Sequence, residues 1–168
     1  MNLKNLFLLL FGFFLCLFSF GQVSNSDGNG GVLRAGMART EITPEIPVML
    51  YGYAARKTPS EGVHDPLSAR IVVFENNGKK VVLVSSDLGS YGRDVFPVIQ
   101  KSIMDKFKLK ESEIFLSTIH THSSPILSLN NERGNPNNIK YTEELNKKLL
   151  VAIDEAFKNL KPVHTGIG

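Results

Sequence analysis

Apolar and polar residues in the middle of the chain follow a pattern that predicts two adjacent strands. Residues 72–85 form two runs rich in β-branched side chains on either side of Asn77-Gly78. Asn-Gly is the pair that best tolerates positive φ at both corners of a type I′ turn. The second run, Val81–Ser85, is almost continuously apolar, as expected of a strand covered on both faces. We therefore expect a hairpin whose second strand lies inside a sheet.

Further along, two segments with helical spacing alternate with strand-like segments. Residues 93–107 carry apolar side chains at three- and four-residue intervals, with Pro97 in or near the first turn. Ile114–Ile119 predicts a strand, Thr142–Leu160 a helix capped by its threonine, and Lys161 the start of another strand. This order predicts an α/β fold, with a mixed sheet, a right-handed βαβ unit and flanking helices.

The first 21 residues have the pattern of a secretory signal peptide. Lys4 precedes an apolar run, Leu6–Phe20, and Ser19 and Gly21 supply small side chains at the −3 and −1 positions. The run is shorter than the ~20 residues that a membrane span requires, which disfavours the alternative of an uncleaved anchor. We expect cleavage between Gly21 and Gln22 and a secreted, periplasmic or cell-surface protein.

The composition and charge of the rest of the chain exclude several classes of function. With 42% hydrophobic and 21% charged residues, the chain has the balance of a globular protein, and we expect one folded domain over residues 32–168 after a flexible lead-in at residues 22–31. Lys and Arg number 19 against 16 Asp and Glu, too even a balance for a nucleic-acid-binding surface. Cys16 is the only cysteine and lies in the leader, which excludes cysteine-based mechanisms in the mature protein.

Candidate chemistry follows the ends of two predicted strands. Ligands of βαβ sheets gather beyond the carboxyl ends of the strands, and here one strand runs into Asp87 and the next into His120 and His122. Side chains two residues apart in extended backbone point to the same side, so both imidazoles can reach one metal or one substrate. Two structural alternatives remain open. The histidines could simply bond the surrounding Ser and Thr residues, and Asp87 could cap the turn that follows it, which is the favoured interpretation for this residue.

The other two histidines are weaker candidates. His64 lies in a turn marked by Gly62 and Pro66, where a structural hydrogen bond is more common than metal ligation. His164 follows Lys161-Pro162, and we expect it at the surface. The sequence contains no Gly-rich phosphate loop and no Gly-x-Ser-x-Gly elbow.

Five blocks of sequence occur in the order seen in the neutral/alkaline, non-lysosomal ceramidase family, which this chain resembles. They are Ala35–Pro44, Met49–Tyr53, Gly62–Arg70, Val84–Gly89 and Ser117–Ser123, and they cover nearly the whole mature chain. The resemblance implies a zinc amidohydrolase that cleaves the N-acyl bond of ceramide to sphingosine and a fatty acid. It implies that His120 is a Zn²⁺ ligand, that His122 contacts the reacting amide, and that ceramide or a similar N-acyl lipid is the partner, with possible peripheral contact to membrane lipid.

This chain differs from the family pattern at two positions, and part of the family's zinc site is expected outside it. Ser124 stands where the family commonly has Gly, and Ser68 where it commonly has Tyr. A second His, a Glu and a Tyr complete the family's zinc shell, and we expect them beyond Gly168. The chain is then the incomplete N-terminal portion of a larger catalytic domain, inactive alone. Two alternatives remain: a related exported zinc hydrolase acting on another amide or ester, and a catalytically silent domain that binds lipid or a partner.

Overall fold

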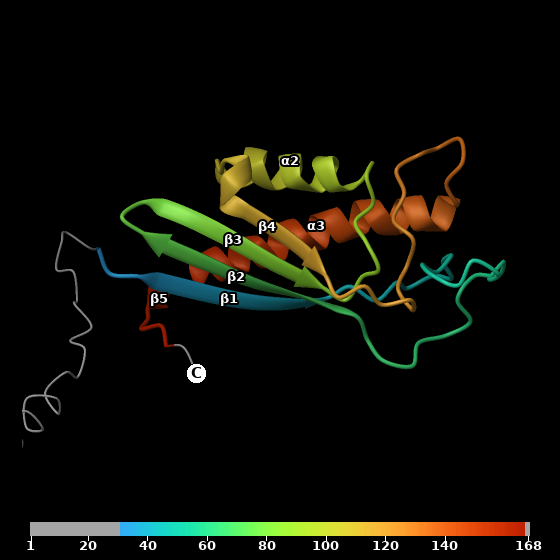
Figure 1. Cartoon of the computed structure of the whole chain (residues 1–168), viewed down its shortest axis with the longest axis horizontal. Helices are drawn as coiled ribbons and strands as arrows, with labels where there is room; N and C mark the ends of the chain where they lie inside the picture. The colour runs from blue at the N-terminus through green and yellow to red at the C-terminus, as the bar shows by residue number, and fades with distance from the viewer. Residues whose placement is uncertain (1–30, 167–168) are drawn as a thin grey trace, which may run out of the picture. The chain divides into compact units, whose positions relative to one another are not determined.

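Residues 31–166 form a five-stranded mixed sheet with two α-helices (Figure 1). The computed structural model describes residues 31–166. Its elements are β1 (Arg34–Glu41), β2 (Ser68–Asn76), β3 (Lys79–Ser86), α2 (Phe96–Phe107), a 3-10 turn η1 (Glu111–Glu113), β4 (Ile114–Thr118), α3 (Pro136–Lys158) and β5 (Lys161–Pro162). In the sheet the order is β4-β3-β2-β1-β5; β3 and β4 are parallel and the other neighbours antiparallel. The predicted α/β class with a mixed sheet is confirmed.

The predicted leader, with Cys16 and the cleavage site after Gly21, lies outside the described residues, as does nearly all of the predicted lead-in. Within residues 31–166, no helix is long and apolar enough to cross a membrane.

The hairpin of β2 and β3 forms where the sequence predicts it. Asn77 and Gly78 connect the paired residues Asn76 and Lys79 and have φ values of 50° and 75°. Both are positive, as a type I′ turn requires. Because β3 lies between β2 and β4, the prediction that its apolar run is an interior strand is also confirmed. The expectation that both of its faces are covered is wrong, because burial alternates along β3 and Val81 is 40% exposed.

Helix α2 connects β3 to the parallel strand β4, as the order of elements predicts. The helix begins at Phe96 rather than at Arg93, has Pro97 in its first turn, and ends before Lys108, which adopts a left-handed conformation with φ 56°. Proline is well tolerated in a first turn because the first backbone amides of a helix have no intrahelical acceptor. A left-handed residue then closes the C-terminus.

Helix α3 starts six residues before the predicted Thr142. The helix begins at Pro136, and its N-cap is Asn135, whose side chain accepts a hydrogen bond from the backbone amide of Asn137. The predicted cap, Thr142, is buried inside the helix, and its hydroxyl donates to the carbonyl of Asn138. The intervening asparagines are weak helix formers, which hid the first turns. Tertiary contacts compensate, because the buried Asn138 side chain bonds two carbonyls and one amide of neighbouring loops.

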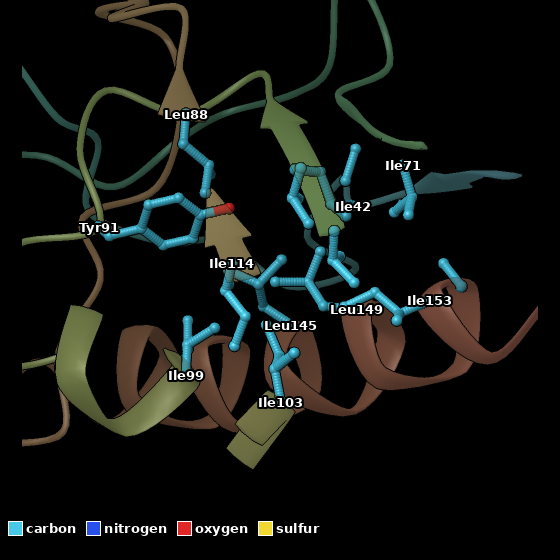
Figure 2. Close-up of a cluster of buried hydrophobic side chains, with 14 of the residues drawn as sticks. Ile42, Ile71, Leu88, Tyr91, Ile99, Ile103, Ile114, Leu145, Leu149 and Ile153 are labelled. Atoms are coloured by element: carbon cyan, nitrogen blue, oxygen red, sulfur yellow. The ribbon is translucent and has the colours of Figure 1, made fainter. Parts of the chain in front are cut away.

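Both helices pack against one face of the sheet, where the hydrophobic core lies. Figure 2 shows side chains from the sheet, from α2 and from α3 converging on this core, with Ile71, Ile103, Leu145 and Leu149 almost completely buried. Helix α3 lies so close to β1 that a Cβ at Gly36 would come within 2.0 Å of the carbonyl oxygen of Ala156. A glycine is therefore required there for packing.

The opposite face of the sheet carries a row of apolar side chains. Strand residues alternate between the two faces, so Phe115, next to the buried Ile114, points away from the helices and is 61% exposed. Cross-strand pairing places Met37 beside Val72, Val72 beside Leu83, and Leu83 beside Phe115. Both helices of residues 31–166 pack on the other face of the sheet, so neither of them covers this apolar row.

Strand β1 is an element for which the sequence analysis gave no secondary-structure prediction. Its residues include Gly36 and two arginines, a composition with low strand propensity. It forms because it pairs with β2 along its whole length, from Arg34 opposite Glu75 to Glu41 opposite Ser68. At its other side it pairs with β5, which confirms the predicted strand at Lys161 as a two-residue element.

Candidate active site

Two polar segments meet where β3 and β4 end. The strands are parallel, with Ser86 beside Thr118, so the residues that follow them leave the sheet at the same edge. The backbone amide of Ile119 donates to the carbonyl of Ser86 at 3.2 Å, which holds the two segments together. The prediction that Asp87 and His120 emerge from neighbouring strands at one edge is therefore confirmed.

His120 is exposed, and one of its two ring nitrogens is fixed by the backbone. Nδ1 lies 2.9 Å from the carbonyl oxygen of Gly89. A carbonyl can only accept, so Nδ1 carries the proton and Nε2 keeps its lone pair. Histidines that bind a metal through one ring nitrogen typically donate a hydrogen bond from the other, often to a backbone carbonyl. In His120 Nδ1 would be the donor and Nε2 the metal ligand. His120 also has φ 61°, an unusual backbone conformation for a residue other than glycine.

His122 lies beside His120 at the same exposed edge. The ring centroids are 5.3 Å apart, so the two imidazoles lie together as predicted. The reason differs from the expected one, because His120 has φ 61° and is not in extended backbone. Gly52 has φ 76° and approaches the His122 ring so closely that a Cβ there would be 2.3 Å from Cγ. The backbone carbonyl of His122 accepts a hydrogen bond from Nη1 of Arg56 at 3.4 Å. The loop that contains Gly52 and Arg56 thus supports the histidine motif.

Two tyrosines of that loop complete a cluster of rings. Tyr51 meets His120 and His122 edge-on, at centroid distances of 5.6 Å and 5.8 Å. Tyr53 meets His122 at 5.4 Å. In the sequence, residues 49–53 stand out only as one block of the family resemblance, which implies no role for them. No periodic signal connects them to the histidines, which lie about 70 residues away in the sequence and come close only in the fold.

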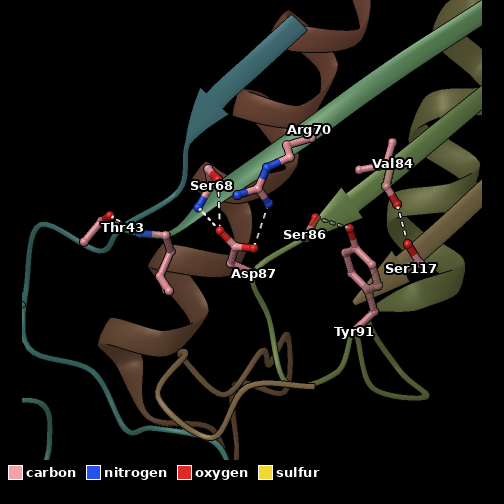
Figure 3. Close-up of polar contacts among 9 residues, drawn as sticks. Thr43, Ser68, Arg70, Val84, Ser86, Asp87, Tyr91 and Ser117 are labelled. Atoms are coloured by element: carbon pink, nitrogen blue, oxygen red, sulfur yellow. Dashed lines mark hydrogen bonds and ion pairs between the residues drawn. The ribbon is translucent and has the colours of Figure 1, made fainter. Parts of the chain in front are cut away.

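Asp87 is occupied in holding the start of β2 (Figure 3). Its carboxylate accepts from the backbone amide and hydroxyl of Ser68, both at 2.9 Å, and from Nη1 of Arg70 at 2.9 Å. Partial burial by itself would raise the pKa of Asp87, but the hydrogen bonds from Arg70 and Ser68 outweigh it and hold the pKa below its ordinary value. Asp87 therefore has a structural role, as favoured from the sequence, but it secures a preceding strand instead of capping the following turn.

The end of β3 is held by a buried tyrosine. The hydroxyls of Tyr91 and Ser86 are 2.7 Å apart, and burial raises the pKa of Tyr91 to about 12 even though the Ser86 hydrogen bond lowers it (Figure 3). On the neighbouring strand, the hydroxyl of Ser117 donates to the carbonyl of Val84 at 3.1 Å. The ends of β3 and β4, from which the site residues emerge, are thus held by side-chain hydrogen bonds.

The remaining histidines lie apart from this cluster. His64 is fully exposed, and its Nδ1 is 2.8 Å from Oδ2 of Asp65, in keeping with the structural interpretation. It lines an open cleft of about 710 Å³ that Thr121 and Ser123 also border. His164 is exposed, as expected from the sequence.

The described residues contain no group of three or more His, Cys, Asp and Glu side chains that could hold a metal ion. The residues described provide one oriented candidate ligand, His120. The Nε2 lone pair of His120 faces away from the Gly89 carbonyl and is chemically suited to Zn²⁺. The site therefore fits one position of a zinc shell.

The family model named "Neutral/alkaline non-lysosomal ceramidase, N-terminal" matches residues 33–165, which include this entire cluster. The chain belongs to this ceramidase family. Among curated relatives, the neutral ceramidase of Drosophila melanogaster is 29% identical over 96 residues, which cover 55% of this chain and 14% of that protein. The neutral ceramidase of Drosophila pseudoobscura pseudoobscura has the same identity and coverage.

Solved ceramidase structures share the fold. The neutral ceramidase from Pseudomonas aeruginosa superposes with a TM-score of 0.62 at 22% identity, and a ceramidase complexed with C2 superposes with a TM-score of 0.64 at 25% identity. Each match covers 78% of this chain and 22% of the solved chain. The chain thus spans about a fifth of the length of these ceramidases.

The two departures from the ceramidase pattern both make structural hydrogen bonds. The hydroxyl of Ser124 is fully buried and accepts from the backbone amide of Gly89 at 2.7 Å. Ser68, also buried, donates its hydroxyl to Asp87. Ser124 therefore holds Gly89, and Ser68 holds Asp87. Both differences from the family pattern leave His120 and His122 in place.

Proposed function

We propose that this chain contributes to a zinc-dependent hydrolase that cleaves the N-acyl bond of ceramide and releases sphingosine and a fatty acid. Family membership over residues 33–165 supports the reaction class. The observation that carries the proposal is the 2.9 Å hydrogen bond from His120 to the Gly89 carbonyl, because it leaves a neutral imidazole nitrogen prepared for a metal ion.

In this proposal His120 is a zinc ligand and its proton stays on Nδ1 throughout. Bound zinc supplies Lewis acidity that activates water at neutral pH. The described residues supply one ligand, and the others come from residues outside the described part of the chain, as expected from the sequence.

His122 is proposed to act on the substrate. Its ring is exposed and lies 5.3 Å from that of His120, which supports a contact between His122 and an amide bound next to the metal. A ring N–H of His122 donates a hydrogen bond to the carbonyl oxygen as negative charge develops there. Water adds to the acyl carbon, the C–N bond breaks, and the leaving nitrogen takes up a proton as the amine.

We also propose that the protein is exported and that it meets its substrate at a lipid surface. The signal-peptide pattern of residues 1–21 supports export. Ceramide is proposed as the substrate because curated relatives of this chain are neutral ceramidases and a similar solved ceramidase is complexed with C2.

The test is hydrolysis of a fluorescent N-acyl-sphingosine by the intact gene product, before and after chelation and after zinc is restored. We expect chelation to abolish turnover and zinc to restore it. Full activity in a verified metal-free preparation would exclude the zinc mechanism. Zinc-dependent cleavage of a different amide or ester, with ceramide left intact, would favour the related-hydrolase alternative, and zinc binding without hydrolysis would favour a silent domain.

A further inference from the structure

We propose that Tyr51 is a positioning residue that fixes the imidazoles of both His120 and His122. The inference deepens the proposed function and rests on it for its catalytic consequence. Tyr51 contacts the two histidine rings at 5.6 Å and 5.8 Å, with interplanar angles of 76° and 70°. The two imidazoles are themselves 5.3 Å apart. The three rings therefore pack against one another, and Tyr51 contacts both of the others edge-on.

The backbone on either side of Tyr51 is tied to the segment that follows the histidines. The amide of Tyr51 donates to the carbonyl of Ser124 at 2.7 Å, and Leu50 forms an isolated antiparallel bridge with Pro125. Ser124 and Pro125 are both buried. Tyr51 thus enters the site from a backbone that is held in place.

The ring of Tyr51 is fixed by Gly89. A Cβ at Gly89 would lie 2.1 Å from Cδ1 of Tyr51, so the ring packs directly on the backbone of this residue. The φ of Gly89 lies outside the left-handed region, so close approach of the ring, not backbone conformation, is what requires glycine here. The same Gly89 accepts the His120 hydrogen bond through its carbonyl and donates its amide to Ser124. Four residues, Tyr51, Gly89, His120 and Ser124, therefore form a closed set of contacts.

Such support is needed because both histidines lie in irregular, exposed backbone beyond the end of β4. One hydrogen bond at Nδ1 leaves the His120 ring able to pivot about that bond, and packing against Tyr51 restricts the pivot. Catalytic groups must be held to within about 0.5 Å, and a 1 Å displacement can cost about 10²-fold in rate. Loss of the Tyr51 ring should therefore affect metal binding through His120 and turnover through His122.

Tyr53 is a matched control in the same loop. Among the described residues its ring contacts are with His122, at 5.4 Å, and with the guanidinium of Arg56, at 5.0 Å. It is 62% exposed. Removal of its ring should leave His120 in place.

The first experiment measures zinc content, kcat, KM and thermal midpoint in the intact gene product with Tyr51→Leu, Tyr51→Phe and Tyr53→Leu. We expect Tyr51→Leu to weaken zinc binding and lower kcat by about 10- to 100-fold, the range for residues that orient a metal ligand, while KM and the midpoint change little. Tyr51→Phe keeps the ring and should stay within about twofold of the wild type. Tyr53→Leu should retain its zinc. If Tyr51→Leu keeps both zinc affinity and kcat, or if Tyr51→Phe is as defective as Tyr51→Leu, the proposal is wrong.

A second measurement keeps this inference separate from the proposed reaction. In metal-free 168-residue protein, the NMR signals of the histidine ring protons report the neighbouring tyrosine rings. We expect Tyr51→Leu to move the signals of both His120 and His122, and Tyr53→Leu to move those of His122 alone. An unmoved His120 signal in Tyr51→Leu overturns the positioning role. This result can be read even if the wild-type protein hydrolyses no ceramide, an outcome that would contradict the proposed function alone.

Discussion

Nδ1 of His120 donates a hydrogen bond to the carbonyl oxygen of Gly89, with 2.9 Å between the two atoms. The two residues follow neighbouring parallel strands and lie 31 positions apart in the sequence. The bond fixes the tautomer of the imidazole and the position of Nδ1, so that Nε2 is left for a metal ion. His122 has no such bond to Gly89 in the proposed mechanism, and mutation can therefore separate the roles of the two motif histidines.

Alanine substitutions should distinguish His120 from His122 in the intact gene product. His120→Ala removes a proposed ligand, so zinc content and activity should both fall. His122→Ala should keep its zinc and lose turnover by about 10²- to 10³-fold, the usual loss when one transition-state donor is removed. Metal analysis and kinetics of both variants make the measurement. Loss of zinc from His122→Ala with retention in His120→Ala would show that the two roles are reversed.

The 168-residue chain by itself should bind zinc weakly and hydrolyse nothing. Its described residues supply one proposed ligand, whereas a catalytic zinc site needs about three. Calorimetric titration with Zn²⁺ and a ceramide assay test this directly. Tight binding together with turnover by this chain would contradict the proposal that further ligands lie outside the described residues.

Asp87→Asn should destabilise the fold in a pH-dependent way. Hydrogen bonds from Arg70 and Ser68 hold the pKa of Asp87 below its ordinary value, so its stabilising effect is complete above about pH 4 and is lost as the pH falls through the lowered pKa. We expect a loss of about 1 to 3 kcal/mol in the free energy of unfolding at pH 7, because the side chain is only 14% exposed. Denaturant titrations at pH 7, 4 and 2.5 should show the difference from wild type shrinking with acidification.

Asp105→Asn is the control for this experiment. Asp105 pairs with Lys101 on the surface of α2, where both side chains are more than half exposed, and such pairs contribute little. Its effect should stay below about 0.5 kcal/mol. A gap between Asp87→Asn and wild type that persists unchanged at pH 2.5 would contradict the assigned role of the carboxylate.

Truncation of two neighbouring residues of β4 should destabilise the fold to very different extents. Ile114 is 9% exposed on the helix side of the sheet, and Ile114→Ala should cost about 2 to 4 kcal/mol of unfolding free energy. Phe115 is 61% exposed on the other face, and Phe115→Ala should cost about 0.5 kcal/mol or less in the 168-residue chain. Equal losses measured by denaturant unfolding would mean that the outer face of the sheet is covered in solution.

Export should leave a mature N-terminus at Gln22. The motivation is the short apolar run with small residues at the −3 and −1 positions. Mass spectrometry of the secreted protein identifies the terminus. Intact Met1, or retention in the membrane fraction, would show that the leader is an anchor.

The sequence by itself determined the elements whose signals are local. The Asn77-Gly78 turn, the apolar run of β3 and the spacing in α2 depend on φ preferences and on burial of near neighbours, and these act within a few residues. The family could also be inferred this way, because its five blocks retain their order along the chain. His120 and His122 were found because their two-residue spacing is a local feature too.

Only the tertiary structure decided which groups support those histidines. His120 contacts Gly89 and Tyr51, which come from two other segments of the chain. Asp87 bonds Ser68 and Arg70, which both come from β2. Strand β1 and the first turns of α3 likewise form through pairing and packing that override weak local propensity. Hydrogen bonds and ring contacts depend on distance in space, and the pairing of β3 with β4 brings the site together at one edge of the sheet.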